Sequence, residues 1–176
     1  MLSKIIIGNV LSFVGAIFLS VSCVLKKREY IYLFQSIECM FLVAAQIFFG
    51  QLGAAAVLIL STIRNAMLAF GAYSSRSLAI LFSLTLIFGL AFNTGGAVGL
   101  IPLIASLAYT VTSYYAKSFS KIKLSLLFNL FIWCVYSYII FDFAGLAVNF
   151  VSFVLNAVSF VKFKSGSDLK RKKDAP

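Results

Sequence analysis

Long apolar segments recur along almost the whole chain, separated only by short polar or basic connections. A hydrocarbon core about 30 Å thick is crossed by roughly 20 apolar residues of helix. Lipid offers the backbone no hydrogen bonds, so such segments must be helices or strands of a closed barrel. They lack the alternation of barrel strands. The sequence therefore predicts an all-α membrane protein with seven transmembrane helices, at 5–25, 30–50, 53–73, 78–93, 97–116, 122–141 and 144–163.

Composition supports lipid as the main partner. Of all residues 62% are hydrophobic and 11% charged, whereas soluble domains carry about 25% charged residues. The net charge of +10 does not indicate nucleic-acid binding, because the basic residues lie at segment ends and in the tail. No histidine occurs, and the three cysteines, Cys23, Cys39 and Cys134, lie within apolar segments. We expect no metal, cofactor or disulfide framework.

The basic residues predict the orientation. With seven crossings, every lysine and arginine except Lys4 and Arg64 falls on one side of the membrane. The positive-inside rule makes that side the cytoplasm. The amino terminus is then outside and the carboxyl terminus inside. A transmembrane domain over 1–164 is followed by a basic cytoplasmic tail, 165–176, which is too polar to pack and is expected to be disordered.

The chain also contains a weak internal repeat. One ungapped shift, which places Lys26 on Lys117, superimposes the ends of the first three segments on those of the last three. Because three crossings reverse direction and a fourth restores it, the two copies are predicted to be parallel. We expect repeat one at 5–73, a linker helix at 78–93 and repeat two at 97–163. Identities under this repeat shift include Gly8 with Gly99, Ser22 with Ser113, Ser61 with Ser152 and Asn65 with Asn156.

Two charges lie inside predicted spans, where each is costly and marks a candidate functional site. Glu38 and Arg64 are about 12 and 13 Å from the basic ends of two consecutive antiparallel helices. An ion pair between them is expected, since either charge alone would be uncompensated. A structural clamp and a role in binding or gating are equally compatible with this pattern.

Neutral polar residues extend the candidate site into repeat two. Asn149, Ser152, Asn156 and Ser159 share one helical face. Such residues often only join helices through hydrogen bonds. Aligned polar faces on several helices favour a hydrated cleft between the repeats. The candidate substrate-binding residues are Glu38, Arg64, Asn65, Asn129, Trp133, Asn149 and Asn156, and Pro102, which interrupts the hydrogen bonds of its helix, is a candidate hinge.

Short motifs along the chain resemble those of a known family. Phe48-Phe49-Gly50, Gly53-Ala54-Ala55-Ala56, Ile63-Arg64, Leu100-Ile101-Pro102 and Leu155-Asn156 are similar to the YgjV family of bacterial inner-membrane proteins. The resemblance implies a location in the bacterial inner membrane and carries no assigned activity. The arrangement of three helices, a linker and three more resembles that of SWEET and PQ-loop transporters.

Two functions remain open. The leading hypothesis is a small-solute transporter or facilitator in which the two repeats rock about a central polar site. The alternative is a non-transporting interaction or receptor-like protein that binds a lipid, a peptide or a partner helix. An enzyme is not expected, because Glu38 is the one carboxylate within a span and no nucleophile has a basic partner. The pattern leaves the oligomeric state open.

The predicted orientation can be tested with reporters fused to each end. We expect alkaline phosphatase to be active when fused to the amino terminus, and green fluorescent protein to fluoresce when fused to the carboxyl terminus, because the termini lie on opposite faces. Both termini on one face would exclude an odd number of crossings.

Overall fold

The computed structural model describes residues 2–173, with side chains described as far as Lys162. This part of the chain holds seven helices and no strand, which confirms the all-α prediction. The helices are α1 (Leu2–Val24), α2 (Arg28–Phe48), α3 (Leu52–Ala69), α4 (Ser75–Ala91), α5 (Gly96–Tyr115), α6 (Phe119–Ile139) and α7 (Phe143–Lys173).

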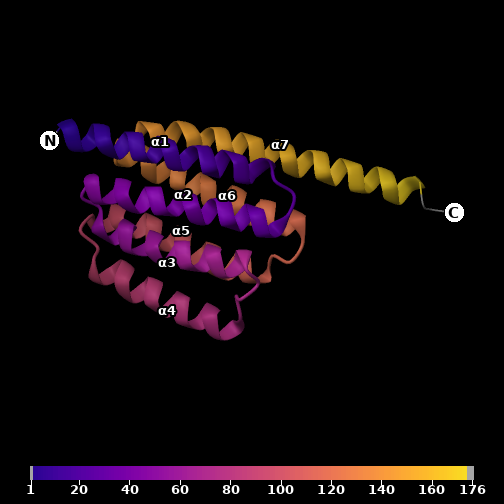
Figure 1. Cartoon of the computed structure of the whole chain (residues 1–176), viewed down its shortest axis with the longest axis horizontal. Helices are drawn as coiled ribbons and strands as arrows, with labels where there is room; N and C mark the ends of the chain where they lie inside the picture. The colour runs from indigo at the N-terminus through magenta and orange to yellow at the C-terminus, as the bar shows by residue number, and fades with distance from the viewer. Residues whose placement is uncertain (1, 174–176) are drawn as a thin grey trace.

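Six of these helices are long and apolar enough to cross a membrane. The exception is α4, whose 17 residues span about 26 Å. It lies at the edge of the bundle beside α3 (Figure 1). That α4 crosses the bilayer stays a prediction.

The six long helices form a closed ring. Contacts join α1 to α2, α2 to α3, α3 to α5, α5 to α6, α6 to α7 and α7 back to α1, while α4 packs outside against α3 and α5. We call α1–α3 triplet one and α5–α7 triplet two. The repeat shift turns each contact of the ring into another contact of the ring. This is the packing expected of two parallel triplets, although the duplication itself stays a prediction.

Two serine pairs join the triplets inside the ring. Ser61 on α3 shares a hydrogen bond of 3.0 Å with Ser106 on α5, and Ser152 on α7 shares one of 3.2 Å with Ser20 on α1. Ser61 and Ser152 are equivalent under the repeat shift. The third helix of each triplet thus bonds the first helix of the other, through small side chains that permit close approach.

The ring is polar inside and apolar outside. On α7, Asn149, Ser152 and Asn156 are buried as predicted, whereas Phe150 and Val154 are exposed. This pattern is the reverse of that in a soluble protein and places apolar side chains where lipid would contact them.

Equivalent turns end α2 and α6. Gly50 has a φ of 75° and Phe141 a φ of 59°. The next residues, Gln51 and Asp142, each donate a backbone hydrogen bond to the carbonyl five residues earlier. A left-handed residue costs a bulky side chain about 1 kcal/mol, so Phe141 carries backbone strain that Gly50 avoids. Both turns reverse the chain within a few residues.

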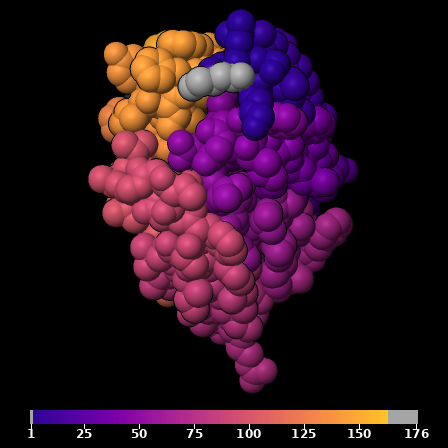
Figure 2. Space-filling model, turned by 90° about the vertical axis from the view of Figure 1, so that its left-hand side faces the viewer, coloured from indigo at the N-terminus to yellow at the C-terminus, as the bar shows by residue number. Residues whose placement is uncertain are grey.

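The turns at Gly50, Asn93 and Asp142 lie at one end of the bundle, next to the start of α1, and we call this the Asp142 end. Figure 2 looks onto it and shows the start of α1 beside the α2–α3, α4–α5 and α6–α7 connections. The opposite end carries the connections after α1 and α5, with Lys26 and Lys117, and we call it the basic end.

The structure differs from the sequence prediction at the tail. Instead of ending near residue 163, α7 continues to Lys173 and projects beyond the other helices (Figure 1). Lysine and arginine are good helix formers, and their charges favour the carboxyl end of a helix. The membrane-spanning part of α7 is Phe143–Lys162, and residues 174–176 lie outside the described residues.

Close approach of α1 and α2 generates a stability prediction at Gly15. A Cβ added there would lie 3.1 Å from the Cβ of Phe41 and 3.2 Å from the carbonyl oxygen of Glu38. We expect Gly15→Leu to lower the free energy of unfolding by about 1–3 kcal/mol because the backbones must separate. Thermal unfolding in detergent would measure this, with the exposed Ile17→Leu as the control. Equal melting temperatures for the two variants would contradict it.

Candidate functional site

A polar cavity lies within the ring, and we call it the central cavity. Its space open to the centre of a water molecule is about 30 Å³, enough for about two waters. Six of the seven predicted binding residues line the central cavity: Glu38, Arg64, Asn65, Asn129, Trp133 and Asn149. Its other polar lining residues are Gln35, Ser61, Ser106 and Tyr109. Most of the residues chosen from the sequence therefore lie around one cavity, while their role in binding stays a prediction.

Asn156 does not line the central cavity. Its amide nitrogen donates a hydrogen bond of 2.7 Å to the carbonyl oxygen of Lys123, and its amide oxygen is buried without a partner. Pro102 is buried within α5, which continues as a helix on both sides of it. A hinge at Pro102 stays a prediction.

The expected ion pair between Glu38 and Arg64 does not form in the described structure. The Arg64 guanidinium donates to Asn65 Oδ1 from Nε at 3.2 Å and from Nη2 at 3.1 Å. Its Nη1 donates to Thr110 Oγ1 at 3.0 Å and to the carbonyl of Ser106 at 3.4 Å. The physical reason is that neutral acceptors already occupy the donors of the guanidinium.

The ring of Tyr109 also stabilises the Arg64 charge. The guanidinium carbon lies 4.7 Å from the centre of that ring, within the range of a cation–π interaction. Tyr109 in turn donates its hydroxyl to Gln35 Oε1 at 2.9 Å. Arg64 therefore links α3 to α5 of the other triplet through two hydrogen bonds and one cation–π contact, while its bonds to Asn65 stay within α3.

Glu38 is left without a polar partner. Its side chain is 8% exposed and makes no hydrogen bond or ion pair in the described structure. It lines the central cavity and also a second cavity, which reaches toward the Asp142 end. The charge of Arg64, which lines the same cavity, acts on Glu38 without a direct contact. A buried carboxylate that accepts no hydrogen bond is costly, so Glu38 is a candidate group for binding a ligand.

Two further atoms in the central cavity lack partners. Gln35 Nε2 is a buried donor and Asn129 Oδ1 a buried acceptor, and neither makes a hydrogen bond. Both residues line the same cavity. An unpaired donor and an unpaired acceptor facing one polar space are suited to bind a hydroxyl group, which supplies both complements.

Asp142 is a functional candidate that lies between two predicted helices, 122–141 and 144–163, and was not among the predicted site residues. Its Oδ1 accepts a hydrogen bond of 2.8 Å from the backbone of Gly145, and its Oδ2 accepts one of 3.0 Å from Ser12. Asp142 thus caps the start of α7. Burial raises the pKa of its carboxyl, and the hydrogen bonds from Gly145 and Ser12 oppose that rise.

A regular pattern on α2 was also missed. Gln35, Glu38, Leu42 and Gln46 recur at spacings of three and four, so they share one face of the helix. All four line one or both cavities. The two glutamines in an otherwise apolar span were the signal that could have identified this face.

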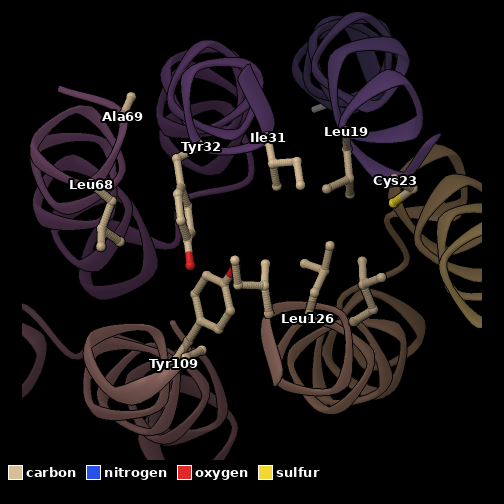
Figure 3. Close-up of a cluster of buried hydrophobic side chains, with 11 residues drawn as sticks. Leu19, Cys23, Ile31, Tyr32, Leu68, Ala69, Tyr109 and Leu126 are labelled. Carbon is tan, nitrogen blue, oxygen red and sulfur yellow. The ribbon is translucent and has the colours of Figure 1, made fainter. Parts of the chain in front are cut away.

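An apolar cluster closes the central cavity toward the basic end. It is built from five helices of the ring, and within it Tyr32 of α2 and Tyr109 of α5 point toward one another (Figure 3). The hydroxyl of Tyr32 is buried without a hydrogen bond. Leu126 of α6 points toward the helices of triplet one that carry Ile31 and Leu19 (Figure 3).

A ring of membrane-length helices with a buried polar interior defines a multi-pass α-helical membrane protein. Over residues 6–167 the chain matches the Imp-YgjV family, described as bacterial inner membrane protein. The chain belongs to this family, and it is a multi-pass protein of the bacterial inner membrane. Comparison with curated proteins found no match, and comparison with solved structures found none either.

Lys123 is a buried charge that the sequence analysis assigned to orientation alone. It is 0% exposed, and its Nζ donates to the carbonyls of Cys23 at 2.5 Å and Ser22 at 3.4 Å. These carbonyls belong to the last turn of α1, where a positive charge is favourable. Lys123 therefore ties α6 of triplet two to the end of α1 in triplet one.

This contact generates a second stability prediction. We expect Lys123→Met to lower the free energy of unfolding by about 1.5–3 kcal/mol, the contribution of charged hydrogen bonds. Lys121→Met is the matched control, because Lys121 is exposed on the same helix and makes no side-chain contact of this kind. Thermal or denaturant unfolding in detergent would compare them. If the two variants were equally stable, the Lys123 contact would not contribute.

Proposed function

We propose that the protein is a small-solute transporter or facilitator whose site is the central cavity between the two triplets. The observation that carries this proposal is the unpaired donor of Gln35 and the unpaired acceptor of Asn129 in that cavity. Buried polar groups normally have a hydrogen-bond partner, so two unpaired atoms on residues of one cavity favour a ligand there. A polar solute bearing hydroxyl groups would pair with both.

The charged residues give the site its further roles in this proposal. Glu38, which makes no hydrogen bond or ion pair in the described structure, is the proposed group that responds to ions or protons. Arg64, held by Asn65 and Thr110, orients the solute or neutralises it. Trp133 offers an aromatic face beside the cavity, on which the apolar face of a sugar-like ring would pack.

Transport requires the bundle to open. A space of about 30 Å³ holds about two waters and is too small for a sugar, so the proposal assigns this structure to a closed state of the transport cycle. In the proposed cycle the triplets rock against each other across the α1–α7 and α3–α5 contacts, as in transporters built from two repeats. The apolar cluster around Tyr32 and Tyr109 would separate when the basic end opens.

The proposed orientation places the basic end in the cytoplasm and the Asp142 end outside. The support is the concentration of lysine and arginine at one end of the bundle. The three-plus-one-plus-three arrangement resembles that of SWEET transporters. The packing of α4 outside the ring, against α3 and α5, is consistent with a linker helix.

The hydrogen bonds between helices favour the alternative function, in which the protein binds a lipid, a peptide or a partner helix and transports nothing. The pairs Ser61–Ser106 and Ser20–Ser152 join the triplets with no solute present. Such bonds act as structural connections in many membrane bundles. This alternative predicts that polar substitutions in the cavity alter stability alone.

Uptake by reconstituted protein separates the two functions. Liposomes carrying the wild type should accumulate a member of a panel of labelled sugars, nucleosides and amino acids. We expect Glu38→Gln and the double variant Gln35→Leu with Asn129→Leu to lower the uptake rate at least about tenfold, since each removes a pairing group worth more than 1 kcal/mol.

Glu29→Gln is the matched control, because Glu29 is exposed at the start of the same helix as Glu38. It should leave the uptake rate unchanged. Absence of uptake across the whole panel, with the cavity variants altering only melting temperature, would reject transport and support the alternative.

A further inference from the structure

The second cavity is distinct from the central one, and we call it the Asp142 cavity. Its polar lining consists of Ser12, Glu38, Gln46, Ser137, Asp142 and Asn149. The space open to the centre of a water molecule is about 10 Å³, which suits one particle of about the size of water. It reaches from Asp142 toward the middle of the bundle, since Gln46 and Glu38 are two turns, or about 12 Å, apart along α2.

The charges of this cavity do not balance. Two carboxylates, Asp142 and Glu38, line it, and no lysine or arginine does. Asp142 accepts hydrogen bonds from Ser12 and Gly145, which favour its charged form. Glu38 is 8% exposed, with no hydrogen bond or ion pair in the described structure. The Asp142 cavity therefore lacks a positive charge.

Neutral oxygens complete the lining. Asn149 donates its amide nitrogen to Ser137 Oγ at 3.4 Å, which leaves its carbonyl oxygen without a hydrogen bond. The side-chain oxygen of Gln46 accepts a single hydrogen bond, from the hydroxyl of Tyr136 at 3.2 Å. Carboxylate, amide and hydroxyl oxygens are ligands of hard cations. Histidine and cysteine are absent from this lining.

The number of carboxylates indicates the charge of the cation. The described residues include no group of three or more acidic, cysteine or histidine side chains that could hold a metal ion. Calcium sites use six to eight oxygen ligands, commonly with several carboxylates. Only one carboxylate here lacks a partner. The carboxylate that accepts no hydrogen bond, Glu38, therefore favours a cation with one positive charge.

We propose that the Asp142 cavity binds one dehydrated Na⁺ ion, which enters from the Asp142 end and neutralises Glu38. Binding itself does not depend on the transport function. Only the further role of this ion, as the coupling ion for solute movement, rests on that proposed function.

Shared residues provide a physical link between ion and solute. Glu38, Trp133 and Asn149 line both cavities. An ion beside Glu38 cancels a charge at the edge of the central cavity, so the two ligands bias each other's binding. By linkage the solute must then strengthen Na⁺ binding by the same factor.

The fluorescence of Trp133 reports on this site directly. It is the one tryptophan of the chain and lines the Asp142 cavity. Purified protein in detergent would be titrated with NaCl while choline chloride keeps the ionic strength constant. We expect a saturable change in Trp133 emission, and a rise in melting temperature that grows with Na⁺ concentration.

Substitutions test the two carboxylates. We expect Glu38→Gln and Asp142→Asn each to weaken Na⁺ binding at least about 30-fold, because each removes a buried ionic partner. Glu38→Asp keeps the charge and should retain a measurable response. Asparagine is as good a helix cap as aspartate, so Asp142→Asn is expected to fold. Glu29→Gln, on the exposed start of α2, should bind Na⁺ as the wild type does.

Three outcomes would overturn the proposal. The first is wild-type protein whose emission and melting temperature are the same in Na⁺ and choline. The second is Glu38→Gln with wild-type affinity. The third is a response to protons alone, seen in a pH titration without Na⁺. These measurements use no solute, so their failure is separate from a failure of transport, and solute uptake that proceeds equally without Na⁺ would refute only the coupling role.

Discussion

In lipid a polar group can find its hydrogen-bond partner only within the protein. The whole bundle follows from this constraint. It makes every spanning segment a helix, turns asparagines and serines toward the inside of the ring, and leaves phenylalanine and valine on the outside. The same constraint makes unpaired atoms informative. Gln35, Glu38 and Asn129 are significant because most other buried polar side chains around them have partners.

The two buried cations show how differently the constraint can be met. Arg64 spreads its donors over an amide, a hydroxyl and a carbonyl, and places its charge over an aromatic ring. Lys123 instead uses the carbonyls that end α1. Neither needs a carboxylate. As a result the acidic side chains of the ring, Glu38 and Asp142, make no ion pair with a lysine or arginine in the described structure and remain free to bind another cation.

Hydropathy and charge were sufficient to predict the seven helices and the residues that face inward, because both depend on segment length and local period. Six of the seven candidate residues reached one cavity for the same reason. The partners of Arg64 were not predictable from its depth in the membrane. Depth shows that Glu38 and Arg64 lie in one layer, but it does not show toward which neighbouring helix each side chain points. Asn156 lies in the polar layer but turns to the backbone of α6. Asp142 was missed because a connection between helices carries no periodic signal.

The correspondence between the triplets stops at the buried positions that carry charge, Glu38, Arg64 and Lys123. Under the repeat shift Tyr32 stands where Lys123 does, and Glu38 stands where Asn129 does. A protein assembled from two copies of α1–α3 would bring two glutamates and two arginines to one axis, with no lysine to complete the end of its first helix. The halves are therefore not interchangeable. A single polypeptide guarantees that each half always meets its opposite, which free association of separate three-helix chains would not.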